Sequence, residues 1–359
     1  MELNGLIEQY GEPQLLLISG AVIGFLFGVV AQRSRFCLRA AVVETIRNQW
    51  GEKLAIWLLA FSVAVLGIQA LIFAGWFDAS ASRFIAAQGS ISGAAIGGVF
   101  FGVGMVLARG CPTRLLVLTA GGNMRSLLTG LVFAVTAQAT MYGVLSPMRT
   151  KLSQFWLVEG GAGRDLLSVT NVGHWGAAAI GVMGFSLALY LGRKANLKVW
   201  SWTGAFGVGM LATAAWWVTY AVSQSSFEAV QVQGLTFAGP SADTLMRVLT
   251  LKPEAWGFDA AVVPAVFVGA MVGVLLGGDW KLEGFHDGRS MIRYIAGAIL
   301  MGFGAVMAGG CAVGAGLSGG SIFALTPWIA LAATWFSAAL TSRWIDPQER
   351  PGAAPSAMP

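Results

Sequence analysis

Long apolar stretches separated by short polar ones dominate the hydropathy pattern of this chain of 359 residues. An α-helix needs roughly 20 such residues to cross the hydrocarbon layer of a membrane. Stretches close to that length cover residues 15–32, 54–77, 90–109, 126–146, 173–192, 200–222, 260–278, 292–310 and 324–342. The pattern therefore predicts an all-α polytopic membrane protein with about nine transmembrane helices.

The composition agrees with this prediction. Hydrophobic residues make up 56% of the chain and charged residues 11%, whereas soluble domains are about 25% charged. The segment before the first stretch, MELNGLIEQYGEPQ, is acidic. A secretory signal peptide begins with a basic region, so we do not interpret the first stretch as one.

The basic residues indicate an orientation. With the N terminus outside, the cytoplasmic segments hold 16 Lys and Arg residues and the outer segments hold 6, which is the bias that the positive-inside rule describes. We therefore expect a periplasmic N terminus and a cytoplasmic C terminus. The basic residues are distributed along the chain as topology signals, so the net charge of +5 does not indicate a nucleic-acid partner.

The pattern GxGxxxAxGC occurs twice, from Gly102 to Cys111 and again 200 positions later from Gly302 to Cys311. A shorter echo places Gly28 nine positions before Cys37. All three cysteines thus lie at one equivalent place. Four stretches precede the fifth and four follow it, so the second set enters the membrane in the opposite sense, as inverted repeats do.

This repeat divides the chain into four parts. We expect a first transmembrane repeat at 1–147, an outer loop and connecting helix at 148–199, a second inverted repeat at 200–345, and a short polar cytoplasmic tail at 346–359. Polar outer loops are predicted at 147–172 and 223–259. The FGVGM segment before Trp216 resembles the one before Cys111, which predicts a fourth repeat without a thiol.

Each cysteine stands beside a predicted helix break. Two arginines precede Cys37, and Pro112 suits the first turn of a new helix, so residues 110–122 are expected to be re-entrant. Non-helical backbone at membrane depth is tolerated where protein or a water-filled cavity covers it. In transporters with inverted repeats, the positive ends of such half-helices meet near the midplane and point at an anion.

Seven residues are the candidates for binding such an anion. They are Cys37, Cys111 and Cys311, the neighbouring Gly110 and Gly310, and the basic Arg35 and Arg109. Each residue type also has a structural interpretation. Glycines allow close packing of transmembrane helices, a lone buried cysteine is usually inert, and an arginine at a helix end anchors it at the membrane surface.

Neither a disulfide framework nor a metal site is expected. The number of cysteines is odd and they lie in apolar surroundings, unlike the cysteines of disulfide-rich secreted domains. His174 and His286 are not spaced with a cysteine as a ligand pair, so we expect no zinc. No other cofactor is indicated.

The segments QRSRFCL, GxGxxxARGC and MGFGAVMAGGCAVGAGL resemble the three signature cysteine segments of the YeeE/YedE family, and the resemblance extends over nearly the whole chain. It implies an hourglass-like fold and thiosulfate uptake in bacteria. It also implies that Cys37, Cys111 and Cys311 pass the ion along a central route by S–H hydrogen bonds. The chain departs from the commoner form of the family at Arg109, where glycine is usual, and at Pro112 and Arg114.

We therefore expect a permease of the bacterial inner membrane for thiosulfate or a related inorganic sulfur anion, and not an enzyme. Its partners would be that anion and the lipid bilayer. Some relatives carry or accompany a small TusA-like sulfur carrier protein. The tail of this chain is too short and polar to be one, so a separate TusA-like carrier is a further candidate partner. Two alternatives remain open: an intramembrane sulfur-relay enzyme that holds a persulfide, and a structural or channel-like subunit with inert thiols.

Overall fold

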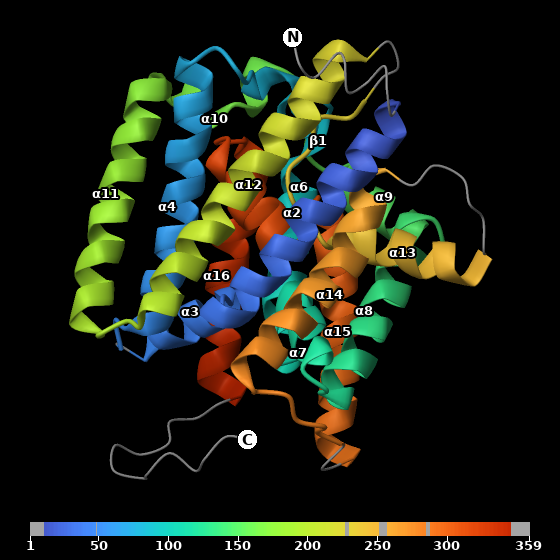
Figure 1. The fold of residues 1–359 in the computed structure, drawn as a ribbon. Coiled ribbons are helices and arrows are strands. Elements are labelled where there is room, and N and C mark those ends of the chain that lie inside the picture. The colour runs from blue at the N-terminus through green and yellow to red at the C-terminus, as the bar shows by residue number, and fades with distance from the viewer. Residues whose placement is uncertain (1–10, 48, 227–229, 251–256, 285–287, 346–359) are drawn as a thin grey trace.

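The computed structural model describes residues 11–47, 49–226, 230–250, 257–284 and 288–345. The predicted tail at 346–359, the acidic segment before residue 11 and His286 lie outside the described residues. The described chain forms a bundle of helices, and α2 begins on the opposite side of this bundle from the end of α16 (Figure 1).

A long helix occupies each of the nine stretches that the hydropathy pattern predicted. Within the described residues these helices are α2 (Glu12–Ser34), α4 (Glu52–Phe73), α6 (Ile91–Leu107), α8 (Met124–Met141), α11 (Gly173–Lys194), α12 (Val199–Ser225), α14 (Phe258–Gly277), α15 (Gly288–Met307) and α16 (Leu325–Ile345). The all-α polytopic fold is therefore confirmed. The helix α11, which we expected to be a connector, packs on α4 at the edge of the bundle.

Not every one of these helices is equally apolar. Among the described residues, seven helical segments are long and apolar enough to cross a membrane, and the number rises to eight if α8 and the following α9 (Ser146–Ser153), bent by 66°, form one span. The helix α16 is not among these segments. Its Thr334 and Ser337 hydroxyls donate to the carbonyl oxygen of Gly98 in α6, at 3.2 and 3.4 Å. These hydrogen bonds satisfy polar groups that lipid could not.

Short helices follow the predicted breaks. They are α3 (Leu38–Ile46), α7 (Pro112–Ala120) and the π-helical η3 (Ala312–Gly319). The helix α7 and the turn after it coincide with the segment that we predicted to be re-entrant. Each of these helices is too short to cross the hydrocarbon layer alone.

Glycines let α6 and α15 cross with their backbones in contact. A Cβ atom at Gly97 would lie 2.8 Å from the carbonyl oxygen of Gly304, and one at Gly297 would lie 2.8 Å from that of Gly104. The two helices therefore cross antiparallel: Gly97 faces Gly304, and Gly104 faces Gly297. Gly297 and Gly304 are the positions 200 residues after Gly97 and Gly104, so the two contacts are equivalent. This reciprocity is the geometry that a two-fold relation between inverted repeats requires.

The two predicted outer loops contain regular elements. The first includes α9, β2 (Leu157–Val158), η2 (Ala162–Arg164) and α10 (Leu166–Thr170), and β2 pairs antiparallel with β1 (Gly89–Ser90). Before β1 lie η1 (Ala79–Ala81) and α5 (Arg83–Ala86).

The prediction of a polar loop at 223–259 was wrong in its middle. Residues Ala238–Thr250 form α13, and Leu235 and Phe237 before it are fully buried. Ser318 of η3 donates to the Leu235 carbonyl at 2.7 Å, which holds this extended segment inside the bundle. At the expected fourth repeat, α12 passes through Trp216 without interruption.

Candidate functional site

A residue in the left-handed conformation follows each of the helices α2, α6 and α15, two positions before a cysteine. These residues are Arg35 (φ 53°), Arg109 (φ 55°) and Gly309 (φ 78°). Only glycine adopts this conformation without a steric cost. The sequence therefore places an arginine twice where the backbone favours glycine.

The residue after each left-handed position makes the same backbone hydrogen bond at the C-terminal end of the helix. The N–H groups of Phe36, Gly110 and Gly310 donate to the carbonyl oxygen five residues earlier, at 3.2, 3.1 and 2.9 Å. This hydrogen bond defines the Schellman motif. The predicted site residues Gly110 and Gly310 are thus buried, and each belongs to the turn that positions the following cysteine.

Each cysteine is the N-cap residue of the short helix that follows. The Cys311 Sγ accepts a hydrogen bond from the Gly314 N–H at 3.5 Å. The N–H groups of Ala40 and Arg114, also three positions on, face the Cys37 and Cys111 thiols without completing a cap hydrogen bond. The free N–H groups and the helix dipole make each thiol's surroundings electropositive.

The structure brings the three predicted cysteines together as a row of buried thiols that form no disulfide. The side chains of Cys37 and Cys111 are hydrogen-bond partners. Cys311 lies close enough to Cys111 for the two to interact electrostatically. The cavity at Cys311 measures about 10 Å³, which is roughly the space of one water molecule, so this end of the row has no room for a larger ion.

At the other end of the row, Cys37 lines a cavity of about 780 Å³. We call this cavity the basic vestibule. Its charged lining residues are Arg35, Arg39, Lys53, Arg109, Arg114 and Lys281, with Asp279 and Glu283 as the acidic members. Six basic and two acidic side chains create a positive potential, which attracts small anions and raises their local concentration.

The predicted site residues Arg35 and Arg109 lie in the basic vestibule, and both are exposed there. An unpaired, desolvated Arg109 would be costly, and its exposure to the vestibule removes that cost. Sequence reasoning missed Arg114, which interacts electrostatically with Cys37 and has a buried Nη1 atom without a hydrogen-bond partner among the described residues. The signal was its position in the first turn of α7, three residues after Cys111.

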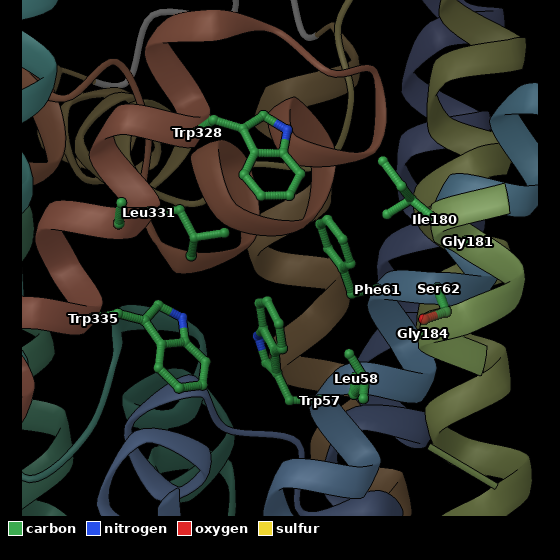
Figure 2. Close-up of a pocket in the computed structure, with 11 residues that line it drawn as sticks. Trp57, Leu58, Phe61, Ser62, Ile180, Gly181, Gly184, Trp328, Leu331 and Trp335 are labelled. Carbon is green, nitrogen blue, oxygen red and sulfur yellow. The ribbon is translucent and has the colours of Figure 1, made fainter. Parts of the chain in front are cut away.

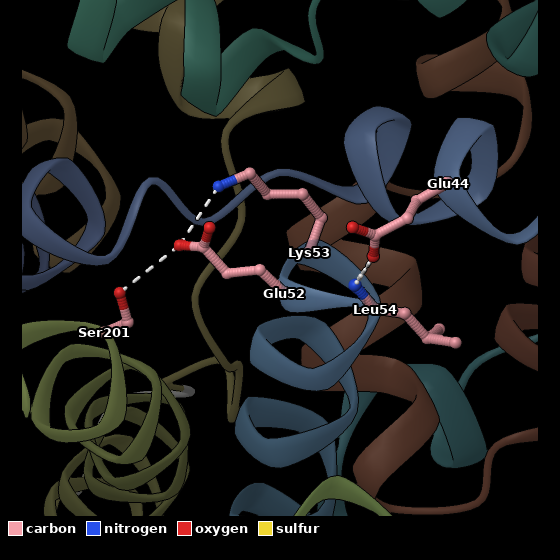
Figure 3. A network of polar contacts seen from close by, with 5 residues as sticks. All are labelled: Glu44, Glu52, Lys53, Leu54 and Ser201. Atoms are coloured by element: carbon pink, nitrogen blue, oxygen red, sulfur yellow. Dashed lines mark hydrogen bonds and ion pairs between the residues drawn. The ribbon is translucent and has the colours of Figure 1, made fainter. Parts of the chain in front are cut away.

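Two acidic residues, Glu44 and Glu52, make contacts at the start of α4, where Lys53 is the basic residue that this helix contributes to the vestibule (Figure 3). Glu52 forms an ion pair with Lys53 at 3.2 Å and accepts a hydrogen bond from the Ser201 hydroxyl at 3.5 Å. Glu44 of α3 accepts from the Leu54 N–H at 2.7 Å, which satisfies one of the free N–H groups at the start of α4. These contacts tie the cysteine-bearing α3 to α4.

A second cavity, of about 360 Å³, has a different character. Figure 2 shows its lining, which includes Trp57, Phe61, Trp328, Leu331 and Trp335 from α4 and α16. No charged residue lines it. Burying a small anion there would leave its charge uncompensated, so this cavity is not the anion site.

Comparison with known proteins agrees with this geometry. A family model described as "Sulphur transport" matches residues 33–340, which include all three cysteines. The chain belongs to this family. As a family member it is similar to two thiosulfate transporters named TsuA. One, from Spirochaeta thermophila, is 26% identical over 328 residues, which cover 88% of this chain and 94% of the relative. The other, from Escherichia coli, is 27% identical over 340 residues, which cover 88% and 91%.

Proposed function

We propose that this protein takes up thiosulfate, or a closely related inorganic sulfur anion, across the bacterial inner membrane. The anion would pass along Cys311, Cys111 and Cys37 and leave through the basic vestibule. The observation that carries this proposal is the row of three thiols, each at the positive end of a half-helix, which ends in a cavity rich in arginine and lysine. The names of the two relatives support thiosulfate as the substrate.

The chemistry of a neutral thiol suits this task. A protonated Sγ donates a weak hydrogen bond to an anion and carries no negative charge that would repel it. Several weak contacts in succession let the ion enter and also leave, which transport requires. The N–H groups at the half-helix ends add positive potential without adding a fixed charge that would hold the ion.

The orientation and the division into repeats belong to the same proposal. The basic vestibule would face the cytoplasm, which agrees with the excess of Lys and Arg on that side. Residues 1–147 and 200–345 would be the inverted repeats, and 148–199 would connect them. The reciprocal glycine contacts between α6 and α15 support this division.

A sulfur-relay enzyme is the second candidate, because the thiols of Cys37 and Cys111 are adjacent. In that reaction a cysteine thiolate attacks the sulfane sulfur of thiosulfate. A bond from Sγ to that sulfur forms, the sulfur–sulfur bond of thiosulfate breaks, and sulfite leaves with the electron pair. The neighbouring thiol would then accept the sulfane sulfur from the persulfide.

Thiosulfate labelled separately at its two sulfur atoms distinguishes these functions in proteoliposomes. The permease delivers both labels into the vesicle in equal amounts. The relay enzyme keeps the sulfane label on the protein and releases the other label as sulfite. Uptake no greater than in protein-free vesicles, with no label on the protein, would contradict both and leave a structural role.

A further inference from the structure

The apolar cavity of about 360 Å³ described above plays no part in the proposed path of the anion. We call it the lateral cavity. It is lined by α4, α11 and α16. The helix α11 packs on α4, whereas α16 packs on α6 and η3, so the lateral cavity lies where two groups of helices meet. Figure 2 shows Trp328 and Trp335 of α16 on one side of it and Ile180 of α11 on the other.

The lateral cavity opens on the outer surface of the bundle. Ala332 is exposed and Ile180 is 38% exposed, and α11 lies at the edge of the bundle (Figure 1). Both α4 and α11 are long and apolar enough to cross a membrane. The opening therefore faces the hydrocarbon of the bilayer and not water.

The lining favours an apolar occupant. The rings of Trp57, Phe61, Trp328 and Trp335 contribute to the wall, and no lining residue is charged. The volume is far larger than the space of one water molecule and lies within the range of roughly 300–1,000 Å³ that ligand cavities have. At this depth the apolar groups that surround the protein are lipid tails, so an acyl chain is the occupant that the position indicates.

Two of the lining helices have basic ends on the side of the basic vestibule. The helix α4 begins beside the vestibule, and α11 and α16 end on that side of the bundle (Figure 1). Their last turns contain Arg193, Lys194 and Arg343, and all three side chains are exposed. Tyr190 and Trp344, exposed near these residues, are of the kind that lies at the head-group level of a bilayer. Basic side chains between transmembrane helices attract anionic head groups.

An occupant of the lateral cavity would contact the wall that supports η3. The Trp328 Nε1–H donates to the carbonyl oxygen of Gly320, which follows the last residue of η3, at 3.2 Å. The Phe61 ring packs on the same glycine, because a Cβ atom there would lie 2.8 Å from its Cε2 atom. The Phe61 and Trp328 rings meet edge to face, with their centres 5.9 Å apart. The short helix that begins after Cys311 is thus held at its far end by two residues of the cavity wall.

We propose that the lateral cavity binds one acyl chain of an anionic phospholipid from the leaflet on the side of the basic vestibule. The chain would lie between α11 and α16 against Phe61 and Trp328, and the head group would lie near Arg193, Lys194 and Arg343. Lipid tails outside the bundle are as apolar as the cavity, so close packing and the head-group charge supply the preference for this site. The inference does not depend on which anion the protein transports.

The test is native mass spectrometry of the full chain in detergent micelles. The protein is titrated separately with palmitoyl-oleoyl phosphatidylglycerol and with phosphatidylcholine that has the same acyl chains, and the spectra count the lipids that each protein ion retains. We expect the first phosphatidylglycerol to bind about tenfold more tightly than the first phosphatidylcholine, because the basic residues attract its charge.

Substitutions locate the bound lipid. Ala332→Phe places a ring in the opening of the lateral cavity, and we expect phosphatidylglycerol to bind about tenfold more weakly, a change of about 1.4 kcal/mol. Ala179→Phe is the matched control, at an exposed alanine of α11 that does not line the cavity, and should bind as the wild type does. Replacing Arg193, Lys194 and Arg343 together by Gln should remove the preference for phosphatidylglycerol and leave phosphatidylcholine binding unchanged.

Three results would overturn this inference. They are unchanged phosphatidylglycerol binding in Ala332→Phe, an equal loss in Ala179→Phe, and a wild-type dimer that Ala332→Phe converts to a monomer, which would show that a second copy of the chain covers the cavity. If Ala332→Phe does not fold, the smaller Ala332→Leu decides by the same titration. No step of this test measures thiosulfate, so its failure and that of the proposed function are independent.

Discussion

Replacing Arg109 by glycine should make the protein more stable, although it removes a charged residue from the proposed site. Arg109 has a φ of 55°, and a left-handed conformation costs a residue with a Cβ atom roughly 1–2 kcal/mol. Glycine removes that cost but adds about 0.5–1 kcal/mol of conformational entropy to the unfolded chain. The net gain is therefore on the order of 0.5–1 kcal/mol.

The equivalent position in the second half allows the reverse experiment. Gly309 has a φ of 78°, and a Cβ atom there would meet only the Phe84 ring, at 4.0 Å. Gly309→Ala thus adds backbone strain without a steric clash, and we expect a loss of the same magnitude. Arg109→Ala is the matched control at the first position, because it removes the charge and keeps the strained conformation.

Thermal unfolding of the purified variants measures these effects. For a chain of this size, 0.5–1 kcal/mol shifts the midpoint by roughly 1–2 °C, upward for Arg109→Gly and downward for Gly309→Ala, with Arg109→Ala near the wild type. Because the Arg109 side chain is exposed, its interaction with an anion is worth about 1 kcal/mol or less. The KM should rise at most about fivefold, and equally in Arg109→Gly and Arg109→Ala. Identical midpoints in all four proteins would refute the backbone argument.

Three further substitutions test the site beside Cys37 and the close packing of the helices around it. Arg114→Gln should raise the KM about tenfold in proteoliposome uptake, more than Arg109→Ala, because the Arg114 guanidinium is partly buried beside Cys37; an equal effect of the two would contradict the site. Gly304→Ala should lower the unfolding midpoint, since its Cβ atom would lie 2.4 Å from the Phe101 nitrogen and overpacking costs about 1–3 kcal/mol. Gly130→Ala in α8, where nothing lies within 4 Å of the added Cβ atom, is the control and should leave the unfolding midpoint unchanged or slightly higher. An equal drop of the midpoint in Gly304→Ala and Gly130→Ala would show that the close crossing of α6 and α15 does not explain the loss.

Much of the fold was predictable because the membrane imposes it. A span must be apolar and about 20 residues long, so hydropathy alone located the nine long helices. The breaks were predictable at Pro112 and at the glycines beside Cys111 and Cys311, since these residues carry local backbone preferences that no tertiary contact overrides.

The sequence did not reveal how the segment after α12 enters the bundle. The FGVGM echo predicted a fourth repeat without a thiol, and at that place α12 continues unbroken while the Trp216 Nε1–H donates to the Ser318 carbonyl at 3.2 Å. The buried residues near Leu235 lie among polar ones in a stretch far shorter than a span, and their burial depends on the packing of η3. Contacts of this kind are tertiary and leave no local signal.

Part of the site was equally hidden. The repeat identified Cys37, Cys111 and Cys311 because equivalent positions recur along the chain. Lys281 and Lys53 come from loops and helix ends far apart in sequence, and only the fold brings them into one vestibule.

The central claim is that a sulfur anion crosses along the three thiols. The most direct test is the initial rate of labelled thiosulfate uptake by proteoliposomes that contain the Cys111→Ala, Cys311→Ala double variant. Alanine changes little volume, so the variant should elute from a sizing column as the wild type does. The account predicts that its uptake falls to the rate of protein-free vesicles. Uptake close to the wild-type rate by this folded variant would contradict the thiol route.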